Sequence, residues 1–572
     1  MLPRFVRSRA PIYGLGAVAV GYGVDHYFYC DSVTRNLRTL AAGVVIAYEY
    51  KVNFVPGSFD RVHQRTADLI LDTCAKNGGL YIKFAQQIAS FSAILPPQWS
   101  SFKKLYDQAP SIPYDEVVTV IKAELGAHPN DLFERFEEVP VASASIAQVH
   151  KATLKGSGLE VAVKVQKPDV KVQVELDLFA FKVVIFLLER LFDLPMTWTV
   201  QTIETHLREE LDFIRECNNA ETAAKFVREV PSLNAAVHVP KVHWDLTSSR
   251  VMTAEWIDGV SFAEVEKVEK RWSQDKISSM MTVLVDLFSD QIFRSGFVHC
   301  DPHPGNILIR PNPANNAQPQ IVLLDHGLYV QQSPQFTSDY TRLWTSLFAH
   351  DIKTVEEIVA RWGISDVQLF AIGTLQKPWT QQKGIEGSTV KDVFSSTTQG
   401  RQELSDDPEV RKKQLYDMQL KMKERAKKYL SDTDKVPREL IFVGRNLNII
   451  RSNNKSYGSP VNRINLMCNW ARATQFDRDA PSTPPSLPAR ILAVARQPSI
   501  LLPQIYTYTS LAAVSLLFHG TRLVNAARRW WNWLVGCTEG RLKGFEDALD
   551  EKVRKGIYEQ TGGLLDEDAF EA

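Results

Sequence analysis

The sequence predicts an α+β fold with two lobes, a small lobe built around a sheet and a larger lobe that is mostly helical. Residues 139–165 and 239–257 contain short alternating or continuous apolar runs typical of strands, whereas the pattern after residue 262 is mainly helical. In addition, four short motifs that are typical of phosphate chemistry follow one another along these elements. Helical segments precede and follow this central part of the chain.

Composition excludes two classes of protein. The 572 residues contain 66 Lys plus Arg and 66 Asp plus Glu, so the formal charge is zero, whereas a bulk nucleic-acid binder needs a basic excess. A hydrophobic fraction of 44% against 23% charged residues argues against a long disordered chain. The six cysteines are scattered without a CxxC pair, which favours reduced thiols over a disulfide framework or a zinc ribbon.

The first 30 residues predict a targeting or membrane-proximal segment. Arg4, Arg7 and Arg9 precede the first acidic residue, Asp25, and residues 12–24 form a short apolar run. This pattern favours a mitochondrial presequence, with a secretory signal or an untargeted terminus as alternatives. The run is shorter than the roughly 20 residues that a membrane-spanning helix needs.

A helical N-terminal extension is expected over 31–135. Residues 59–92 have a helical apolar pattern, and a second helix is expected at 111–125, begun by Pro113. The small lobe is expected over 136–259. Its predicted elements are a hairpin of strands 142–150 and 160–165, helices 171–193 and 198–228, and strands 239–244 and 250–257.

The larger lobe is expected over 260–375, with short strands at 296–299, 307–309 and 321–324. Three further segments follow it: a polar helical insertion at 376–476, a proline-rich linker at 477–488, and an apolar tail at 489–572.

Within the apolar tail, residues 500–518 carry no formal charge, and arginines and tryptophans follow at 528–533. Tryptophan beside arginine favours a membrane interface, and a buried terminal helix is the alternative.

The residues that predict chemistry are three oxygen-bearing side chains and one lysine. Asn306 follows Asp301 by five residues, and Asp325 follows an apolar strand 24 residues after Asp301. Phosphoryl transfer needs one carboxylate for the acceptor, and an amide and a second carboxylate for Mg²⁺. Lys164 ends the Val-Ala-Val-Lys strand, from which a lysine reaches phosphate oxygens and a helix glutamate.

The order of strand lysine, helix glutamate, DxxxxN and DxG predicts the protein-kinase-like two-lobe fold, with a helical N-terminal extension and helical C-terminal additions. A transition-metal cluster of His299, Cys300, Asp301 and His303 is the alternative for one of these motifs. We disfavour it because side chains this close in sequence rarely point to one centre.

The expected phosphate-binding loop departs from an ordinary kinase. No GxGxxG precedes Lys164, and residues 140–148 are rich in alanine and serine instead. Alanine has a Cβ, so the backbone cannot approach phosphates as a glycine loop does. Backbone amides and two serine hydroxyls remain as donors. The predicted nucleotide contacts are Ala142, Ser143, Ala144, Ser145 and Lys164.

From about residue 60 to 350 the chain resembles the UbiB, or aarF-domain-containing, atypical kinases, in particular a mitochondrial branch. The resemblance rests on Lys-Phe-Ala-Gln at 83–86, the loop at 140–148, Glu210-Leu211-Asp212, and the HCDPHPGN and LLDHG segments. The family usually has glycine where this chain has Ala85 and Ala147, and His326 stands where a DFG has phenylalanine.

The resemblance implies a role for each of these motifs. Lys83 would contact Glu210 and Asp212 and, with Gln86, guard the place where a peptide substrate would bind. Glu216 would pair with Lys164. Asp301 would be catalytic, Asn306 and Asp325 would bind the metal, and Glu255 and Trp256 would lie at the hinge beside adenine. From spacing alone, Asp212 and Glu216 share a face of the expected helix 198–228, whereas Glu210 needs a different partner.

The expected function is that of an atypical kinase or ATPase that binds Mg-ATP or ADP. The resemblance implies a role in mitochondrial lipid or ubiquinone homeostasis rather than protein phosphorylation. It also implies an inner-membrane location, membrane lipids as partners, and a quinone or lipid substrate. A small-molecule phosphotransferase and a catalytically silent nucleotide-binding scaffold are the alternatives. Retention of the phosphoryl-transfer residues argues against the scaffold, and Lys83 and the acids at 210 and 212 argue against the small-molecule enzymes.

Overall fold

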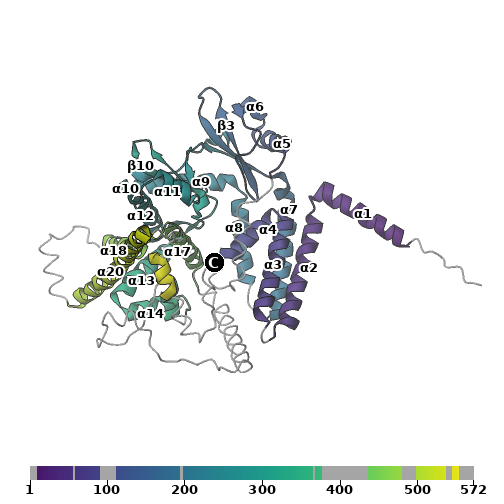
Figure 1. Cartoon of the computed structure of the whole chain (residues 1–572). Coiled ribbons are helices and arrows are strands. Elements are labelled where there is room, and N and C mark those ends of the chain that lie inside the picture. The colour runs from purple at the N-terminus through teal and green to yellow at the C-terminus, as the bar shows by residue number, and fades with distance from the viewer. Residues whose placement is uncertain are drawn as a thin grey trace, which may run out of the picture.

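The computed structural model describes residues 10–55, 58–90, 111–192, 197–364, 367–375, 436–479, 498–535 and 544–552. A helical extension stands beside two lobes, the sheet-containing small lobe at the top and the helical large lobe below it (Figure 1). Residues 1–9 of the predicted targeting segment, the predicted insertion up to residue 435, and residues 480–488 of the predicted linker lie outside the described residues.

The extension consists of α1 (Ala10–Tyr29), α2 (Ser32–Tyr48), α3 (Phe59–Asn77) and α4 (Leu80–Ser90), with a π-helical turn at Glu49–Asn53. The apolar pattern at 59–92 predicts continuous helix, but the helix breaks at Gly78 and Gly79. Both glycines adopt positive φ, 65° and 51°, which side chains with a Cβ rarely tolerate. This break turns α4 back toward the lobes, so that the helix carrying Lys83 reaches them.

A buried ion pair joins the extension to α7 (Pro168–Phe192), the first helix after the hairpin. Arg35 Nη2 lies 2.8 Å from Asp177 Oδ2, and the two side chains are only 5% and 0% exposed. Asn36 donates to the other oxygen of Asp177 at 3.2 Å, and Tyr81 donates to Asn36. Burial raises the pKa of Asp177 to about 6, although the Arg35 guanidinium acts in the opposite direction. The pair fixes the position of α2, but burying its two charges costs desolvation free energy.

The small-lobe sheet has five strands in the order β1-β3-β4-β6, with β2 paired to β3. Every pairing is antiparallel. Its strands are β1 (Phe133–Phe136), β2 (Ala142–Ser143), β3 (Ala147–Leu154), β4 (Glu160–Gln166) and β6 (Val251–Glu255).

The predicted hairpin is present as β3 and β4, and α5 (Tyr114–Leu125) begins after Pro113 as expected. Val117, Val120 and Ile121 of α5 are buried with the valines of β4 in one apolar cluster. The predicted strand 239–244 is wrong, because it makes only one isolated bridge, between Val242 and Ala254.

The expected single helix 198–228 is two helices, α8 (Thr197–Glu210) and α9 (Phe213–Glu229). Asp212 is the N-cap of α9: its backbone is extended, and its carboxylate accepts a hydrogen bond from the Ile214 N–H at 3.1 Å. Aspartate is among the best N-cap residues because its side chain satisfies an amide that lacks a helical partner. The shared helix face inferred for Asp212 and Glu216 is therefore wrong.

The large lobe contains a four-stranded sheet in the order β5-β10-β9-β7 and a two-stranded sheet of β11 and β8. The strands are β5 (Val237–His238), β7 (Val260–Ser261), β8 (Phe297–His299), β9 (Ile307–Asn312), β10 (Asn315–Leu323) and β11 (Tyr329–Gln331). The expected strands near 296, 307 and 321 are thus confirmed. Parallel pairing of β5 with β10 ties residues 237–238 to the strand that leads to Asp325.

Helices surround these strands. The shorter ones are α10 (Pro231–Ala236), α11 (Val265–Arg271), α14 (Ile352–Arg361) and α15 (Val367–Leu375), whereas α6 (Pro129–Leu132) lies in the small lobe beside α5 and β1. The longer ones are α12 (Gln274–Asp290), α13 (Pro334–Ala349), α17 (Arg438–Ser456), α18 (Arg463–Asp479) and α20 (Pro498–Val535). One apolar cluster joins them, with the fully buried Trp344 among its largest side chains. The helix α18 also includes residues 477–479, which the sequence assigned to the linker.

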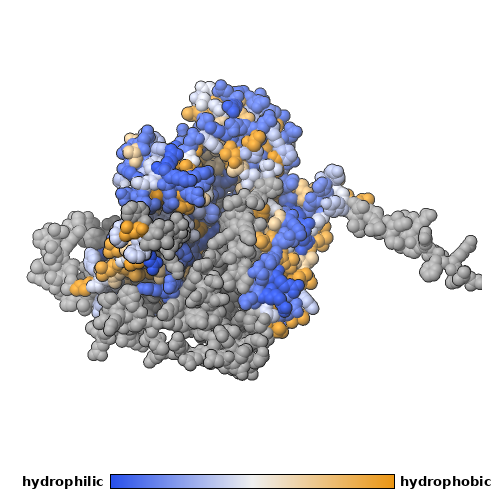
Figure 2. Space-filling view, in the orientation of Figure 1, coloured by the Kyte–Doolittle hydropathy of each residue, from blue (hydrophilic) through white to orange (hydrophobic). Residues whose placement is uncertain are grey.

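The apolar run at 500–518 is part of α20, which has 38 residues. Leu511 and Phe518 are buried against the large lobe, whereas Trp530 and Trp531 near the end of the helix are 61% and 62% exposed. Among the described helices, none combines the length and apolarity needed to cross a membrane. Apolar side chains also lie on the visible surface of the extension (Figure 2).

Replacing Asp177 by alanine tests how the extension is attached. We expect Asp177→Ala to lower the free energy of unfolding by about 3–5 kcal/mol in denaturant titration, because it leaves the Arg35 guanidinium buried without its carboxylate. The matched control is Asp72→Ala, which removes an exposed pair with Lys76 in the same extension and should cost no more than about 1 kcal/mol. Equal losses of unfolding free energy in Asp177→Ala and Asp72→Ala would contradict the attachment of the extension through Asp177.

Candidate active site

Lys164 and Glu216 form the centre of the site. Lys164 lies on β4, and its Nζ is 2.7 Å and 2.8 Å from the two carboxylate oxygens of Glu216 on α9. The Glu216 side chain is 3% exposed and that of Lys164 is 23% exposed. The lysine also lies over the Phe213 ring, 5.1 Å from its centroid. The pairing implied by the resemblance is therefore present, and it fixes the direction of the lysine.

A second lysine reaches the same place from the extension. Lys83 on α4 is paired with Glu210, the last residue of α8, at 2.9 Å. Burial opposes the charged form, yet the carboxylates of Glu210, Asp325 and Asp301 hold the pKa of Lys83 above its ordinary value. Lys83 is thus a fixed positive charge between the extension and the lobes.

The expected contact of Lys83 with Asp212 is replaced by a different arrangement. Within the described part of the chain, the carboxylate paired with Lys83 is that of Glu210, while Asp212 caps α9. The break at 211–212 separates the two acids onto different elements. Gln86 lies on α4, but its side chain is outside the described residues.

Asp325 follows β10 and faces both lysines. Its Oδ2 lies 4.0 Å from Lys164 Nζ, and its Oδ1 accepts a hydrogen bond from the Gly327 N–H at 2.9 Å. Burial favours the neutral acid, but Lys164 and Lys83 outweigh it and hold the pKa of Asp325 well below its usual range. A Cβ on Gly327 would lie 3.3 Å from Asp325 Oδ1, so glycine lets the turn close against the carboxylate. Asp325 is therefore ionised at neutral pH.

Asn306 and Asp301 lie next to Asp325. The backbone carbonyl of Asn306 accepts from the Leu324 N–H at 2.9 Å, which ties the asparagine to the residue before Asp325. The Asn306 side chain donates to the backbone carbonyl of Asp301 at 3.5 Å. An ionised carboxylate and an amide oxygen are hard ligands, and this donor set fits Mg²⁺.

The alternative of a transition-metal cluster receives no geometric support. The His299 ring stacks on Tyr329, with centroids 4.8 Å apart, and Cys300 is fully buried. In the described portion of the chain, no three His, Cys, Asp or Glu side chains are grouped to hold one metal ion.

The alanine- and serine-rich loop folds into a tight strand pair above the lysines. Ala142 pairs with Val149 and Ser143 with Gln148, and the Ala144 N–H donates to the Ala147 carbonyl. The Ser145 hydroxyl is buried and has no hydrogen-bond partner among the described residues. A buried unpaired hydroxyl is costly, and a ligand oxygen at this loop would satisfy it. The loop therefore fits a phosphate group through this hydroxyl.

Glu255 and Trp256 connect the two lobes. The Glu255 carboxylate lies 2.7 Å from His238 Nε2 and 3.7 Å from Arg310 Nη1, and Trp256 donates to Asp258. Their backbone N–H groups donate to the carbonyls of Lys241 and Glu160. Both side chains are thus engaged within the protein, and the adenine contact expected at this position stays a prediction.

Arg445 is the residue of the site that the sequence did not reveal. It lies on α17, and its Nη2 is 3.2 Å from Asp301 Oδ1. The available signal was the polar run Arg445-Asn446 and Asn453-Asn454 within a helix that is otherwise partly apolar. Nothing local in that run identifies Asp301 as the partner, because the two residues are far apart in the chain.

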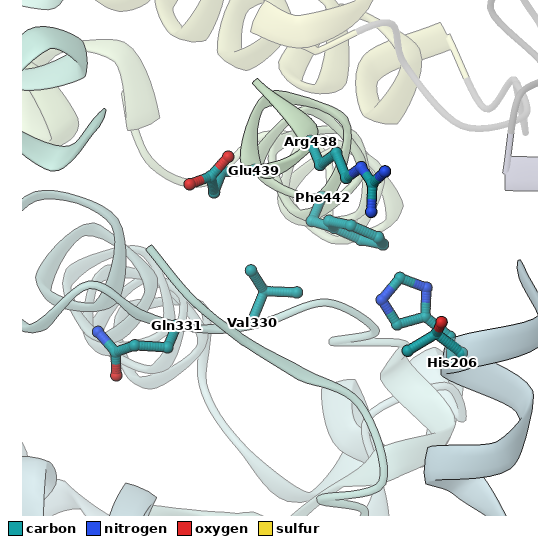
Figure 3. A pocket seen from close by; sticks show the side chains of 7 residues that line it. His206, Val330, Gln331, Arg438, Glu439 and Phe442 are labelled. Atoms are coloured by element: carbon teal, nitrogen blue, oxygen red, sulfur yellow. The ribbon is translucent and has the colours of Figure 1, made fainter. Parts of the chain in front are cut away.

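A cavity of about 310 Å³ lies between α8, β11 and α17, beside the candidate active site. Figure 3 shows the His206 ring and the Phe442 ring turned toward each other, and their centroids are 4.6 Å apart. Burial, together with Arg445, Arg215 and Arg438, lowers the pKa of His206 to about 4. The complete lining is Thr205, His206, Val330, Gln331, Arg438, Glu439 and Phe442.

Comparison with known proteins finds a family model, related sequences and a solved structure that match this chain. Residues 104–359 match the family described as the ABC1 atypical kinase-like domain. An ABC1 family protein of Schizosaccharomyces pombe is 35% identical over 474 residues, which cover 82% of this chain and 84% of the relative. An AarF domain-containing protein kinase 1 of Mus musculus is 33% identical over 467 residues, covering 78% and 83%. A solved structure of the Rv3197–erythromycin complex from Mycobacterium tuberculosis is 26% identical with a TM-score of 0.38, covering 51% of this chain and 72% of that one.

The neutral state of His206 predicts a pH-dependent stability. The ordinary pKa of 6.5 falls to about 4 in the folded chain, so between these values the unfolded chain binds more protons. The contribution of His206 is therefore complete above about pH 6.5 and declines as pH falls toward 4, by up to about 2 kcal/mol at pH 5.

His206→Phe keeps an aromatic ring against Phe442 and removes this titration. We expect the stability difference between wild type and His206→Phe, measured by denaturant titration, to shift in favour of the variant between pH 7 and pH 5. Parallel pH profiles of the two proteins would contradict a neutral, buried His206.

Proposed function

The chain belongs to the ABC1 atypical kinase-like family, and from this premise we propose that it binds Mg-ATP or Mg-ADP between its lobes and acts as an atypical kinase or ATPase. The family resemblance drawn from the motifs is confirmed, as is the α+β protein-kinase-like fold class. One observation supports the activity above all others: Asp325 is held ionised between Lys164 and Lys83, next to Asn306 and Asp301. This is a combination of charges suited to a metal-bound polyphosphate.

The roles of the residues follow from their positions. A bound Mg²⁺ would supply positive charge that compensates the charge of the phosphates. Asp325 and Asn306 would hold the metal, and Lys164, oriented by Glu216, would contact phosphate oxygens. The Ser145 hydroxyl and the backbone amides of its loop would donate to the phosphates. Asp301 would orient the attacking hydroxyl or water and accept its proton.

The acceptor is proposed to be a small or lipid-linked molecule, or water, rather than a protein. The support is the position of α4, whose Lys83 is ion-paired with Glu210 at the end of α8, where the family resemblance implies that a peptide substrate would bind. The cavity of about 310 Å³ beside the site is large enough for a head group and small for a peptide segment.

We further propose a mitochondrial, inner-membrane-associated setting with a role in lipid or ubiquinone homeostasis. The arginines before the first acid support targeting. The exposed Trp530 and Trp531 after Arg528 and Arg529 support contact with a lipid surface. Exposed apolar side chains also lie on α2 and α7 of a different part of the molecule, among them Leu37, Val44, Phe179, Phe186 and Leu191.

A nucleotide-binding scaffold without turnover is the second candidate. The ion pair between Asp301 and Arg445 favours it, since one oxygen of the carboxylate that would accept the proton is already engaged by a guanidinium. The two candidates differ in phosphate release by the purified protein, with and without membranes, because a scaffold binds nucleotide but releases no phosphate.

Asp325→Asn tests the assignment of the nucleotide site. Removing one negative charge from a metal ligand between two lysines should lower Mg-nucleotide affinity and phosphate release by at least about 100-fold. Affinity is measured by titration calorimetry and release by a phosphate assay, with Asp72→Asn in the extension as control. Unchanged nucleotide binding and turnover in Asp325→Asn would make the site assignment wrong.

Lys83→Ala tests the guard role of α4. The variant leaves Glu210 and Asp325 without one compensating charge, so we expect altered nucleotide turnover or the appearance of autophosphorylation. Transfer of labelled phosphate to the protein and phosphate release are the two measurements. The control is Lys76→Ala on α3, whose exposed pair with Asp72 lies outside the site. If Lys83→Ala matches the control in both assays, α4 does not guard the site.

A further inference from the structure

Helix α17 lies along the segment that carries Asp301 and contacts it at successive points. The Asn446 side chain donates to the His299 carbonyl at 2.6 Å, and the Asn453 side chain donates to the Pro302 carbonyl at 3.3 Å. Arg445 is ion-paired with the carboxylate of Asp301, which lies between His299 and Pro302 in the chain. Phe442 packs against Cys300 in a small apolar cluster. This helix lies after residues 104–359, which match the family model.

The Arg445–Asp301 pair is enclosed by the protein. The Arg445 side chain is 9% exposed and that of Asp301 is 26% exposed, and Nη2 lies 3.2 Å from Oδ1. A guanidinium this little exposed is unfavourable unless it is paired, so Asp301 is a fixed partner rather than an incidental one. The guanidinium is planar and always charged, and it therefore orients a carboxylate better than an ammonium does.

The opposite end of α17 is anchored independently of the active site. Arg451 and Lys455 are both ion-paired with Asp550, and Asn454 donates to Glu546 at 2.9 Å. Both acids lie in the terminal helical segment 545–552. Arg445 is thus carried by a helix held on both sides, which fixes the guanidinium before any ligand binds.

We propose that Arg445 is a positioning residue that holds Oδ1 of Asp301 so that the second carboxylate oxygen faces the acceptor. The role rests on the proposed phosphoryl transfer. As the new bond from the acceptor oxygen to phosphorus forms, the acceptor O–H bond breaks and its proton passes to Asp301. The bond from phosphorus to the leaving oxygen breaks, and its electron pair stays on ADP. Arg445 touches neither acceptor nor nucleotide in this scheme and acts through Asp301.

The test uses the full-length chain and Arg445→Met, with Arg451→Met as the matched control on the same helix. Steady-state phosphate release with Mg-ATP gives kcat and KM, and calorimetry gives nucleotide affinity. For Arg445→Met we expect kcat to fall about 10–100-fold with KM and nucleotide affinity little changed, because the ground-state contacts of the nucleotide remain. Arg451→Met should lower the unfolding temperature without this selective loss of kcat.

Two further measurements separate positioning from a merely structural role. Arg445→Lys retains a positive charge, so it should recover part of kcat, and it replaces Arg445→Met in the test if that variant does not fold. Added guanidinium should raise kcat of Arg445→Met but not of Arg451→Met. In an Asp301→Asn background, Arg445→Met should have little further effect, since the two residues act as one unit.

Each outcome has a definite meaning. If wild type neither binds nor turns over Mg-ATP, the proposed function fails and the positioning role fails with it. If wild type is active but Arg445→Met and Arg445→Lys retain its kcat, only the role of Arg445 is overturned. A rise in kcat in these variants would also overturn it, because it would make the ion pair an inhibitory contact.

Discussion

Two lysines and three carboxylates come together where the extension and the two lobes meet, and each lysine is paired with a glutamate. Lys164 is paired with Glu216, Lys83 with Glu210, and Asp325 faces both lysines. Removing either lysine would leave its glutamate without the partner that compensates its charge, which proteins tolerate poorly in a buried place. The arrangement therefore requires that β4, α4, α8, α9 and the end of β10 converge, and most of the fold serves that convergence.

This requirement accounts for the irregular places in the chain. The paired left-handed glycines after α3 let α4 turn so that Lys83 meets Glu210. The break after Glu210 places Glu216 on a separate helix, where it reaches Lys164 instead of following Glu210 along one helix. The buried pair of Arg35 and Asp177 attaches the extension to α7 at a point away from the site. This attachment supports α4 on the side that faces away from the site.

The C-terminal additions have two distinct relations to the site. Helix α17 contacts the Asp301 segment directly and is anchored to the terminal segment by ion pairs. Helix α20 packs on the large lobe through residues such as Leu511 and Phe518 and exposes Trp530 and Trp531 at its far end. One addition thus supports the chemistry we propose, and the other exposes the aromatic side chains on which the proposed lipid contact rests. The zero net charge of the chain does not show that its acidic, basic and aromatic groups lie in different places.

The sequence by itself determined the order of the motifs, the β3–β4 hairpin, the start of α5, and the identity of Lys164, Asp301, Asn306 and Asp325 as candidates. These depend on spacing and periodicity over a few residues, which a sequence displays directly. Only the tertiary structure decided that Lys83 meets Glu210 while Asp212 serves as a cap, because that choice depends on where the helix breaks. It also decided that α17 contacts the segment that carries Asp301, since the Asn446 side chain donates to the His299 carbonyl across a separation of 147 residues. No local pattern encodes such a contact, because it depends on how the intervening chain packs.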